Sequence, residues 1–313
     1  NRLLGEASQN PEVPHLIRAL AELGQIEPGY VVENMRSHLP PIEETLPRMV
    51  FDPTETLGLR GTIRRLNRTA SMVRERLSLD SWRLINQVYH EFEPDEDVGA
   101  EFGLPWLQLK LNTLISDLSA FSGLVAENMT RTLGWRFLEL GRRIERAIHT
   151  VFAIHMLLLP EGQRETPALE AALEFGDCIL TYRSRYLTTL QLAPALDLLV
   201  TDETNPRSIA YQQARVVEHL EQLPRDPRDA LRSPEQRLGM AALHAVRMLS
   251  ADDLISMHTS NERRSLDKLL ARVSGMLPKL ADAISHKYLI HTKLPRQLTE
   301  LRAKAKGSPR GGT

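Results

Sequence analysis

The sequence contains little cysteine, no excess of charge and no long hydrophobic run. Cys178 is the only cysteine, which excludes a disulfide framework or a thiolate metal site within one chain and favours a reducing, cytoplasmic setting. A net charge of -1 gives no reason to expect nucleic acid or an anionic membrane as a partner. The longest apolar run, 148–159, is shorter than the roughly 20 residues that a bilayer span needs.

The two ends of the chain differ in composition from the helical part. No basic segment followed by an apolar one opens the sequence, which argues against a secretory signal on the chain as given. The first residue is Asn1, so we expect the natural N-terminus to lie upstream. The glycine-containing tail 304–313 is expected to be a disordered end.

Helical patterning is what the sequence does have. Aromatic residues make up 5% of the chain, β-branched alternation is nearly absent, and leucine, alanine, arginine and glutamate recur at helical spacing. We therefore predict an all-α, multi-helix bundle, with helices at 14–24, 29–37, 57–78, 81–91, 104–127, 131–159, 166–192, 206–222, 234–249 and 261–291.

A weak internal repeat is visible at an offset of 150 residues, where segment 51–59 aligns with segment 201–209. If the repeat is genuine, the domain covers 1–303 in two halves, about 1–127 and 128–303, and the first half is truncated before residue 1. The aligned pairs are Asp52 with Asp202, Thr54 with Thr204, Leu59 with Ile209, Arg65 with Arg215, and Leu66 with Val216.

Asp52 and Asp202 each stand just before a predicted helix, where a carboxylate stabilises the free amide groups by about 1 kcal/mol. Asn205 followed by Pro206 has the pattern of an N-cap and first helical position. A catalytic role for the two aspartates is the alternative interpretation.

The most informative segment is 127–147, where charged residues run along an otherwise apolar helix. Helical spacing allows Glu139 to reach Arg142 and Arg143, and Arg142 to reach Glu145. We interpret Glu139, Arg142, Glu145 and Arg146 as an ion network that holds two helices in register, or alternatively as an anion pocket, since the planar guanidinium suits carboxylate and phosphate.

A second charged face lies in segment 182–186. Tyr182, Arg185 and Tyr186 point the same way at helical spacing, with Arg183 turned off that face. The simpler interpretation is an amphipathic helix whose tyrosines pack their rings in the core. If this helix neighbours segment 127–147, their arginines form the best anion site of the chain, comprising Arg142, Arg146, Arg183 and Arg185.

Motifs for metal and cofactor binding are missing. A di-iron bundle needs paired Glu-x-x-His motifs, and the sequence has none. Glu145 and His149 lie one helical turn apart, which is too little for a metal site. Zincin, nucleophile-elbow and phosphate-loop motifs are also lacking, so we expect no metal or cofactor in this chain.

Several segments resemble one known family, the alpha-E domain, an all-helical bacterial domain named for its Glu-Arg motif. The match rests on segments 128–131, 134–138 and 141–146, and extends to 182–186, 198–202, 205–208 and 284–288 with His291. The version here resembles the C-terminal half of longer proteins, in which the domain follows a circularly permuted ATP-grasp domain, and it lacks the family's first Glu-Arg helix.

The resemblance implies a context and no catalytic residue. ATP-grasp enzymes join a carboxylate to an amine through an acyl-phosphate, so ATP and Mg²⁺ are implied only for a fused or separate ligase. The expected role is an accessory or interaction domain that binds the ligase, a peptide or a small acidic substrate. The alternatives are an independent enzyme with Glu145 and Asp202 as acid and base, and a structural oligomerisation bundle.

Overall fold

The computed structural model describes residues 50–51, 58–93, 103–159, 165–186, 189–225, 231–255 and 264–289, and every regular element in these ranges is helical. The prediction of an all-α fold is confirmed. Within these ranges, no helix is both long and apolar enough to cross a membrane. The helices expected at 14–24 and 29–37 and the tail 304–313 lie outside the described residues.

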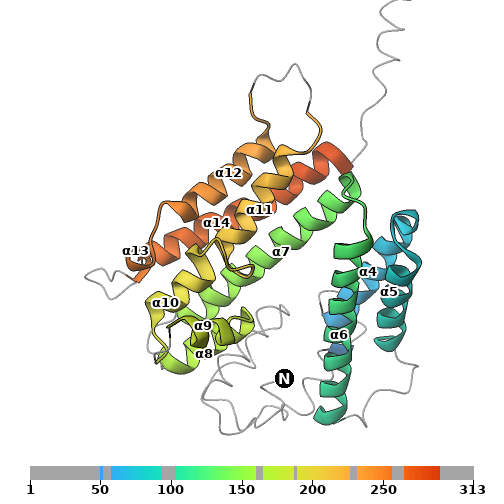
Figure 1. Cartoon of the computed structure of the whole chain (residues 1–313), viewed down its shortest axis with the longest axis horizontal. Coiled ribbons are helices and arrows are strands. Elements are labelled where there is room, and N and C mark those ends of the chain that lie inside the picture. The colour runs from blue at the N-terminus through green and yellow to red at the C-terminus, as the bar shows by residue number, and fades with distance from the viewer. Residues whose placement is uncertain are drawn as a thin grey trace, which may run out of the picture.

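Three helices form an N-terminal layer with a small core of its own (Figure 1). They are α4 (Leu59–Met72), α5 (Leu79–Glu91) and α6 (Leu104–Asn128), with a short 3₁₀ turn, η3 (Arg74–Arg76), after α4. The central helix α5 packs against both α4 and α6. It begins where the Ser78 hydroxyl accepts a hydrogen bond from the Ser81 amide at 3.1 Å, which satisfies one of the free donors of the first turn.

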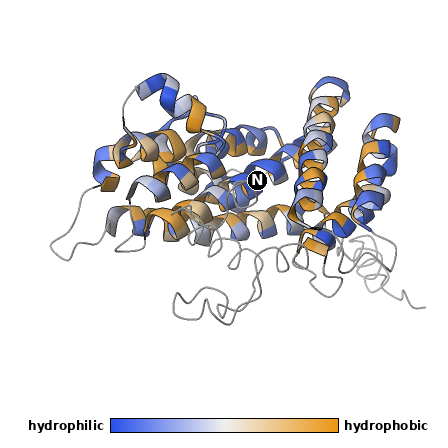
Figure 2. Cartoon of the chain, turned by 90° about the horizontal axis from the view of Figure 1, so that it is seen from below, coloured by the Kyte–Doolittle hydropathy of each residue, from blue (hydrophilic) through white to orange (hydrophobic). Residues whose placement is uncertain are grey.

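Four helices form a closed bundle after the connection 129–132. They are α7 (Leu133–Leu158), α11 (Ile209–Glu221), α12 (Pro234–Arg247) and α14 (Arg264–Ile284). α7 packs on α11, α11 on α12, α12 on α14, and α14 returns to α7. Figure 2 shows hydrophobic and hydrophilic residues on each of these helices, as expected when one face enters a shared core and the other meets solvent.

Shorter helices cover one end of this bundle (Figure 1). They are α8 (Glu165–Phe175), α9 (Ile179–Tyr186), α10 (Leu192–Leu196), which continues as a π-helical turn η4 (Asp197–Thr201), and α13 (Ala251–Ile255). A second π-helical turn, η5 (Ser285–Leu289), extends α14. The loop between η4 and α11 leads directly into α11, the helix that packs on α7.

Several sequence-based helix boundaries differ from the structure. The helix expected at 57–78 ends at Met72, before the short turn η3. The single helix expected at 166–192 is broken after Phe175, because Asp177 adopts a left-handed backbone with φ of 52°. A side chain at Gly176 would approach the Leu199 side chain to 2.6 Å, so any larger residue there would require Leu199 to move. The helix expected to start at 206 begins at Ile209, because the Ser208 hydroxyl, rather than Asn205, caps it by accepting from the Tyr211 amide at 3.0 Å.

Candidate anion-binding site on helix α7

Glu139 is the centre of an ion network within α7. Its side chain is buried, and its two carboxylate oxygens accept hydrogen bonds from Arg142 Nη1 at 3.0 Å and Arg143 Nη2 at 2.7 Å. These are the three- and four-residue contacts that the helical spacing predicts. Because the carboxylate is buried and the two arginines are half-buried, removing one partner would leave an uncompensated charge.

The network continues from α7 to the start of α11. Arg143 Nη1 donates to Gln212 Oε1 at 3.5 Å, and Gln212 Nε2 donates to the Pro206 carbonyl at 2.5 Å. Gln212 is completely buried. Pro206 is followed by Arg207, which forms an ion pair with Asp177 at 2.6 Å. The positive charge of Arg207 also acts on Arg146 of α7.

Arg146 differs from its neighbours. Its side chain is half-buried, and its guanidinium makes no hydrogen bond or ion pair with any of the described residues. Burial lowers the pKa of Arg146, and the positive charges of Arg207, Arg143 and Arg142 lower it further, while Glu139 opposes them. The charged form of Arg146 is therefore poorly compensated in this environment.

We call Arg142, Arg143, Arg146 and Arg207 the arginine cluster. Its two carboxylate partners are Glu139, which serves two arginines, and Asp177, which serves Arg207. Four guanidinium groups thus share two carboxylates, and among them only the guanidinium of Arg146 has no carboxylate partner in the described part of the chain. An arrangement of this kind can bind an anionic group, because arginine presents a fixed fork of donors to carboxylate or phosphate.

Glu145 lies outside this network. Its side chain is on the exposed face of α7, and it makes no hydrogen bond or ion pair with Arg142 or another of the described residues. The structure therefore brings Glu139, Arg142 and Arg146 together but separates Glu145 from them.

The two candidate arginines of α9 are held by other carboxylates. Arg183 Nη2 lies 3.4 Å from Glu170 Oε1. Arg185 forms an ion pair with Asp202 and donates a hydrogen bond to the Thr204 hydroxyl at 3.2 Å. α9 packs on α8 and α10. These arginines consequently fasten the small helices and the η4–α11 loop, and neither joins the arginine cluster.

The tyrosines of α9 also have structural contacts. The Tyr182 ring is completely buried, and its hydroxyl donates to the Thr189 carbonyl at 3.3 Å and accepts from the Gln191 amide at 2.9 Å. Tyr186 donates to Asp197 at 3.0 Å. Burial, followed by this hydrogen bond to Asp197, raises the pKa of Tyr186 to about 12, which makes it an unsuitable general base near neutral pH.

Asn205 has a structural position inside the η4–α11 loop. Its amide donates to the Leu198 carbonyl at 2.7 Å and to Cys178 Sγ at 3.3 Å, and its Oδ1 accepts from the Arg207 amide at 3.2 Å. The buried amide thereby fixes the backbone that carries Arg207.

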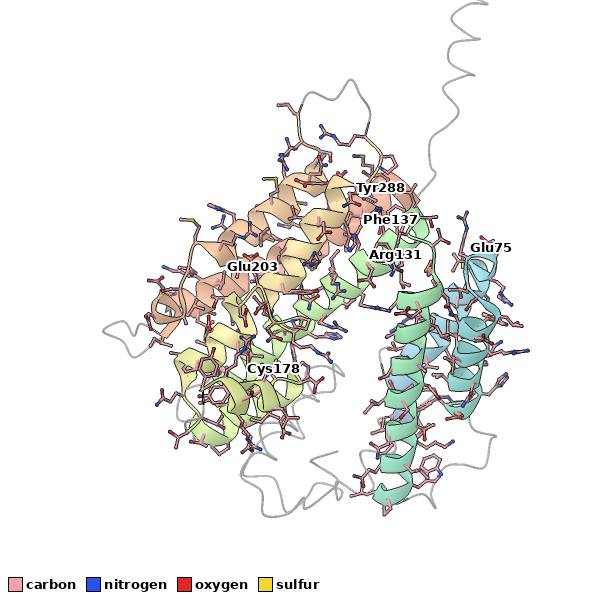
Figure 3. The ribbon with its side chains drawn as sticks, viewed as in Figure 1. Glu75, Arg131, Phe137, Cys178, Glu203 and Tyr288 are labelled. Carbon is pink, nitrogen blue, oxygen red and sulfur yellow. The ribbon has the colours of Figure 1, made fainter. Side chains whose placement is uncertain are left out.

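The segment 284–288 forms a separate contact at the far end of α14. Buried Glu235 accepts from Lys287 Nζ at 2.5 Å and from the Tyr288 hydroxyl at 3.0 Å. Figure 3 shows Tyr288 beside Phe137 near the start of α7, with ring centroids 5.6 Å apart. This contact ties α14 to α12 and α7.

The remaining candidates cannot be placed. Asp52 and His291 lie outside the described residues. Among the described part of the chain, no group of three or more histidine, cysteine, aspartate or glutamate residues is arranged to hold a metal ion. Sequence reasoning did not single out Arg207 or Gln212 as site residues, because nothing local marks a loop arginine or a helical glutamine as the neighbour of a distant helix.

Comparisons with known proteins agree with the fold. The model of the Alpha-E family, described as a predicted alpha-helical domain with a conserved ER motif, matches residues 1–289. The chain is 27% identical over 252 residues to "Uncharacterized protein Rv2567" of Mycobacterium tuberculosis and to "Uncharacterized protein Mb2597" of Mycobacterium bovis. The alignment covers 77% of this chain and 27% of each relative, so the chain spans about a quarter of their length. No solved structure matches.

Proposed function

Since the chain belongs to the Alpha-E family, we propose that it is a binding domain that accompanies an ATP-dependent amide ligase and holds an acidic group of the ligase's substrate or product. The domain itself is proposed to be non-catalytic. The ligase is of the ATP-grasp type, fused to this domain or separate from it, and the curated relatives are long enough to leave room for further domains.

The observation that carries the proposal is the unpaired guanidinium of Arg146 within the arginine cluster. A half-buried charge without a counter-ion is unfavourable unless something compensates it. A carboxylate or phosphate placed against Arg146 and Arg207 would supply two or more charge-assisted hydrogen bonds. Both groups belong to the chemistry of amide ligation through an acyl-phosphate, which requires a carboxylate and releases phosphate.

The two alternative functions have less support. Catalysis by Glu145 and Asp202 would require the two carboxylates to share a site, yet Asp202 is engaged by Arg185 and Thr204 while Glu145 is on the exposed face of α7. A purely structural role accounts for Glu139, Arg142 and Arg143, which form ion pairs with one another. It leaves the unpaired charge of Arg146 unexplained.

Calorimetric titration with glutarate and with inorganic phosphate would test the binding proposal. We expect Arg146→Gln to weaken binding about 10- to 100-fold, because a hydrogen bond to a charged group contributes roughly 1.5–3 kcal/mol. Arg183→Gln is the matched control, since it removes an arginine outside the cluster. Circular dichroism would verify that both variants remain helical. Equal binding by the wild-type chain and Arg146→Gln, or no binding of either anion, would overturn the proposal.

The association with a ligase requires its own test. An ATP-grasp ligase would be assayed for ADP release with an acidic peptide, with and without this chain. We expect the wild-type chain to lower the KM for the peptide and Arg146→Gln to have no such effect. An unchanged KM in the presence of the wild-type chain would contradict the accessory role.

A further inference from the structure

Asp177 places a carboxylate in the turn between α8 and α9, on a backbone that few residues adopt readily. Its φ is 52°, in the left-handed region that aspartate and asparagine tolerate better than most residues. The turn is fixed by backbone hydrogen bonds, from the Asp177 amide to the Glu174 carbonyl at 2.9 Å and from the Cys178 amide to the Leu173 carbonyl at 2.7 Å. The backbone of Asp177 is therefore held in place, although its side chain is 75% exposed.

The partner of Asp177 is Arg207, whose backbone is also fixed. The Arg207 amide donates to the buried Asn205 side chain, and the preceding carbonyl is held by Gln212, which is linked in turn to Arg143 of α7. Two fixed backbones thus hold Arg207 Nη2 within 2.6 Å of Asp177 Oδ2.

The two carboxylates of the cluster differ in how firmly they are bound. Glu139 is buried and is shared by two arginines of its own helix, so displacing it would leave buried charges unpaired. Asp177 makes one contact from a side chain that is mostly in water, where an ion pair contributes little. An incoming anion can compete with Asp177 far more easily than with Glu139.

Resting on the proposed function, we infer that Asp177 is an internal competitor of the ligand: it occupies Arg207 in the free protein, and a ligand carboxylate or phosphate replaces it and bridges Arg207 and Arg146. Binding then exchanges one anion for another at Arg207 and adds a new ion pair at Arg146. No covalent bond forms or breaks. Asp177 lowers the affinity of the site and returns to Arg207 when the ligand leaves.

Asp177→Asn tests this inference directly, because asparagine has nearly the same shape and tolerates the left-handed backbone. Glutarate and inorganic phosphate would be titrated into the wild-type chain, Asp177→Asn and Glu221→Gln. The last is the control, since it removes an exposed carboxylate paired with Arg232 near the end of α11. We expect Asp177→Asn to bind both anions about two- to five-fold more tightly than the wild-type chain, the range that loss of one exposed ion pair allows, and Glu221→Gln to bind unchanged.

A second variant separates local competition from a change in net charge. In an Arg207→Gln background, Asp177→Asn should have no further effect, since the contested guanidinium is missing. If the wild-type chain binds anions but Asp177→Asn does not tighten binding more than Glu221→Gln does, this inference is wrong and the proposed function stands. If neither the wild-type chain nor Asp177→Asn binds, both are wrong. Binding by Asp177→Asn alone would overturn the proposed function of the wild-type chain, and with it this inference, which requires a ligand that the wild-type chain binds.

Discussion

Two adjacent glutamines of α11 should respond in opposite ways to the same substitution. Gln212 and Gln213 are both completely buried. Gln212 donates to the Pro206 carbonyl and accepts from Arg143, whereas neither the Oε1 nor the Nε2 of Gln213 has a hydrogen-bond partner. A buried amide without partners costs roughly 1–3 kcal/mol by mutational measures. We therefore expect Gln213→Met to raise the free energy of unfolding by about 1–3 kcal/mol.

Methionine is the appropriate replacement, because it is unbranched and adapts its shape to irregular core space. Gln212→Met is the control at the next position of the same helix. It should lower the free energy of unfolding by about 1–3 kcal/mol, since it leaves the Pro206 carbonyl and one Arg143 donor without their partner. The sign of the effect, more than its size, distinguishes the two positions.

Equilibrium unfolding in urea would measure both effects. Trp135 lies edge-on against His219 of α11, with ring centroids 5.2 Å apart, so its fluorescence reports on the α7–α11 contact. Replacing Trp82 and Trp106 by phenylalanine would remove the signal of the N-terminal layer. Equal destabilisation by the two methionine substitutions, with unchanged dependence on urea, would refute the reasoning and show that Gln213 has polar partners in solution.

Three further predictions concern the same helices. Glu139→Gln should destabilise the bundle by about 3–5 kcal/mol, because two half-buried arginines lose their shared counter-ion. Glu218→Gln is the control: it removes a carboxylate from an exposed ion pair and should change stability by less than about 1 kcal/mol. Urea unfolding of both variants would measure the difference. Burial lowers the pKa of His219 below its usual value of about 6.5. The stability contributed by neutral His219 is therefore fully present above about pH 6.5 and is lost as the pH falls through the lowered pKa. This pH dependence of the unfolding free energy should be weaker in His219→Gln. Gly239→Ala should lower the free energy of unfolding by about 1–3 kcal/mol, since the added methyl group would approach Leu220 to 2.6 Å. Gly141→Ala places its methyl group in open space and should stabilise α7 by up to about 1 kcal/mol. The two substitutions should therefore shift the melting temperature in opposite directions.

Helical spacing predicted some of the contacts within α7 but not all of them, since Arg142 pairs with Glu139 and not with Glu145. Glu139 meets Arg142 and Arg143 as expected, because residues three and four apart lie on the same face whatever surrounds the helix. Which of several charges on that helix lacks a partner was beyond prediction. Arg143 donates a hydrogen bond to Gln212, whereas Arg146 has no such partner among the described residues. This difference depends on how α11 and its preceding loop pack against α7.

The misplaced helix boundaries have a similar origin. The pattern across 166–192 is helical on both sides of Gly176, and one glycine within a helical pattern costs only about 1 kcal/mol. The break is decided by tertiary contact, since the backbone of Gly176 lies against Leu199 of η4. At the start of α11 the predicted cap, Asn205, is instead buried against Leu198 and Cys178, and Ser208, three residues later, caps the helix.

Positions that the predicted internal repeat aligns, 150 residues apart, differ in their packing. α4 starts 150 residues before α11, and each packs against the next long helix, α5 and α12 respectively. Val216 of α11 is completely buried, because α7 and α12 pack on that helix, whereas Leu66, its counterpart in α4, is 37% exposed. Among the described residues, no helix packs on α4 as α7 packs on α11. α7 carries three members of the arginine cluster, so the cluster lies in the closed four-helix arrangement and in the second of the two predicted halves.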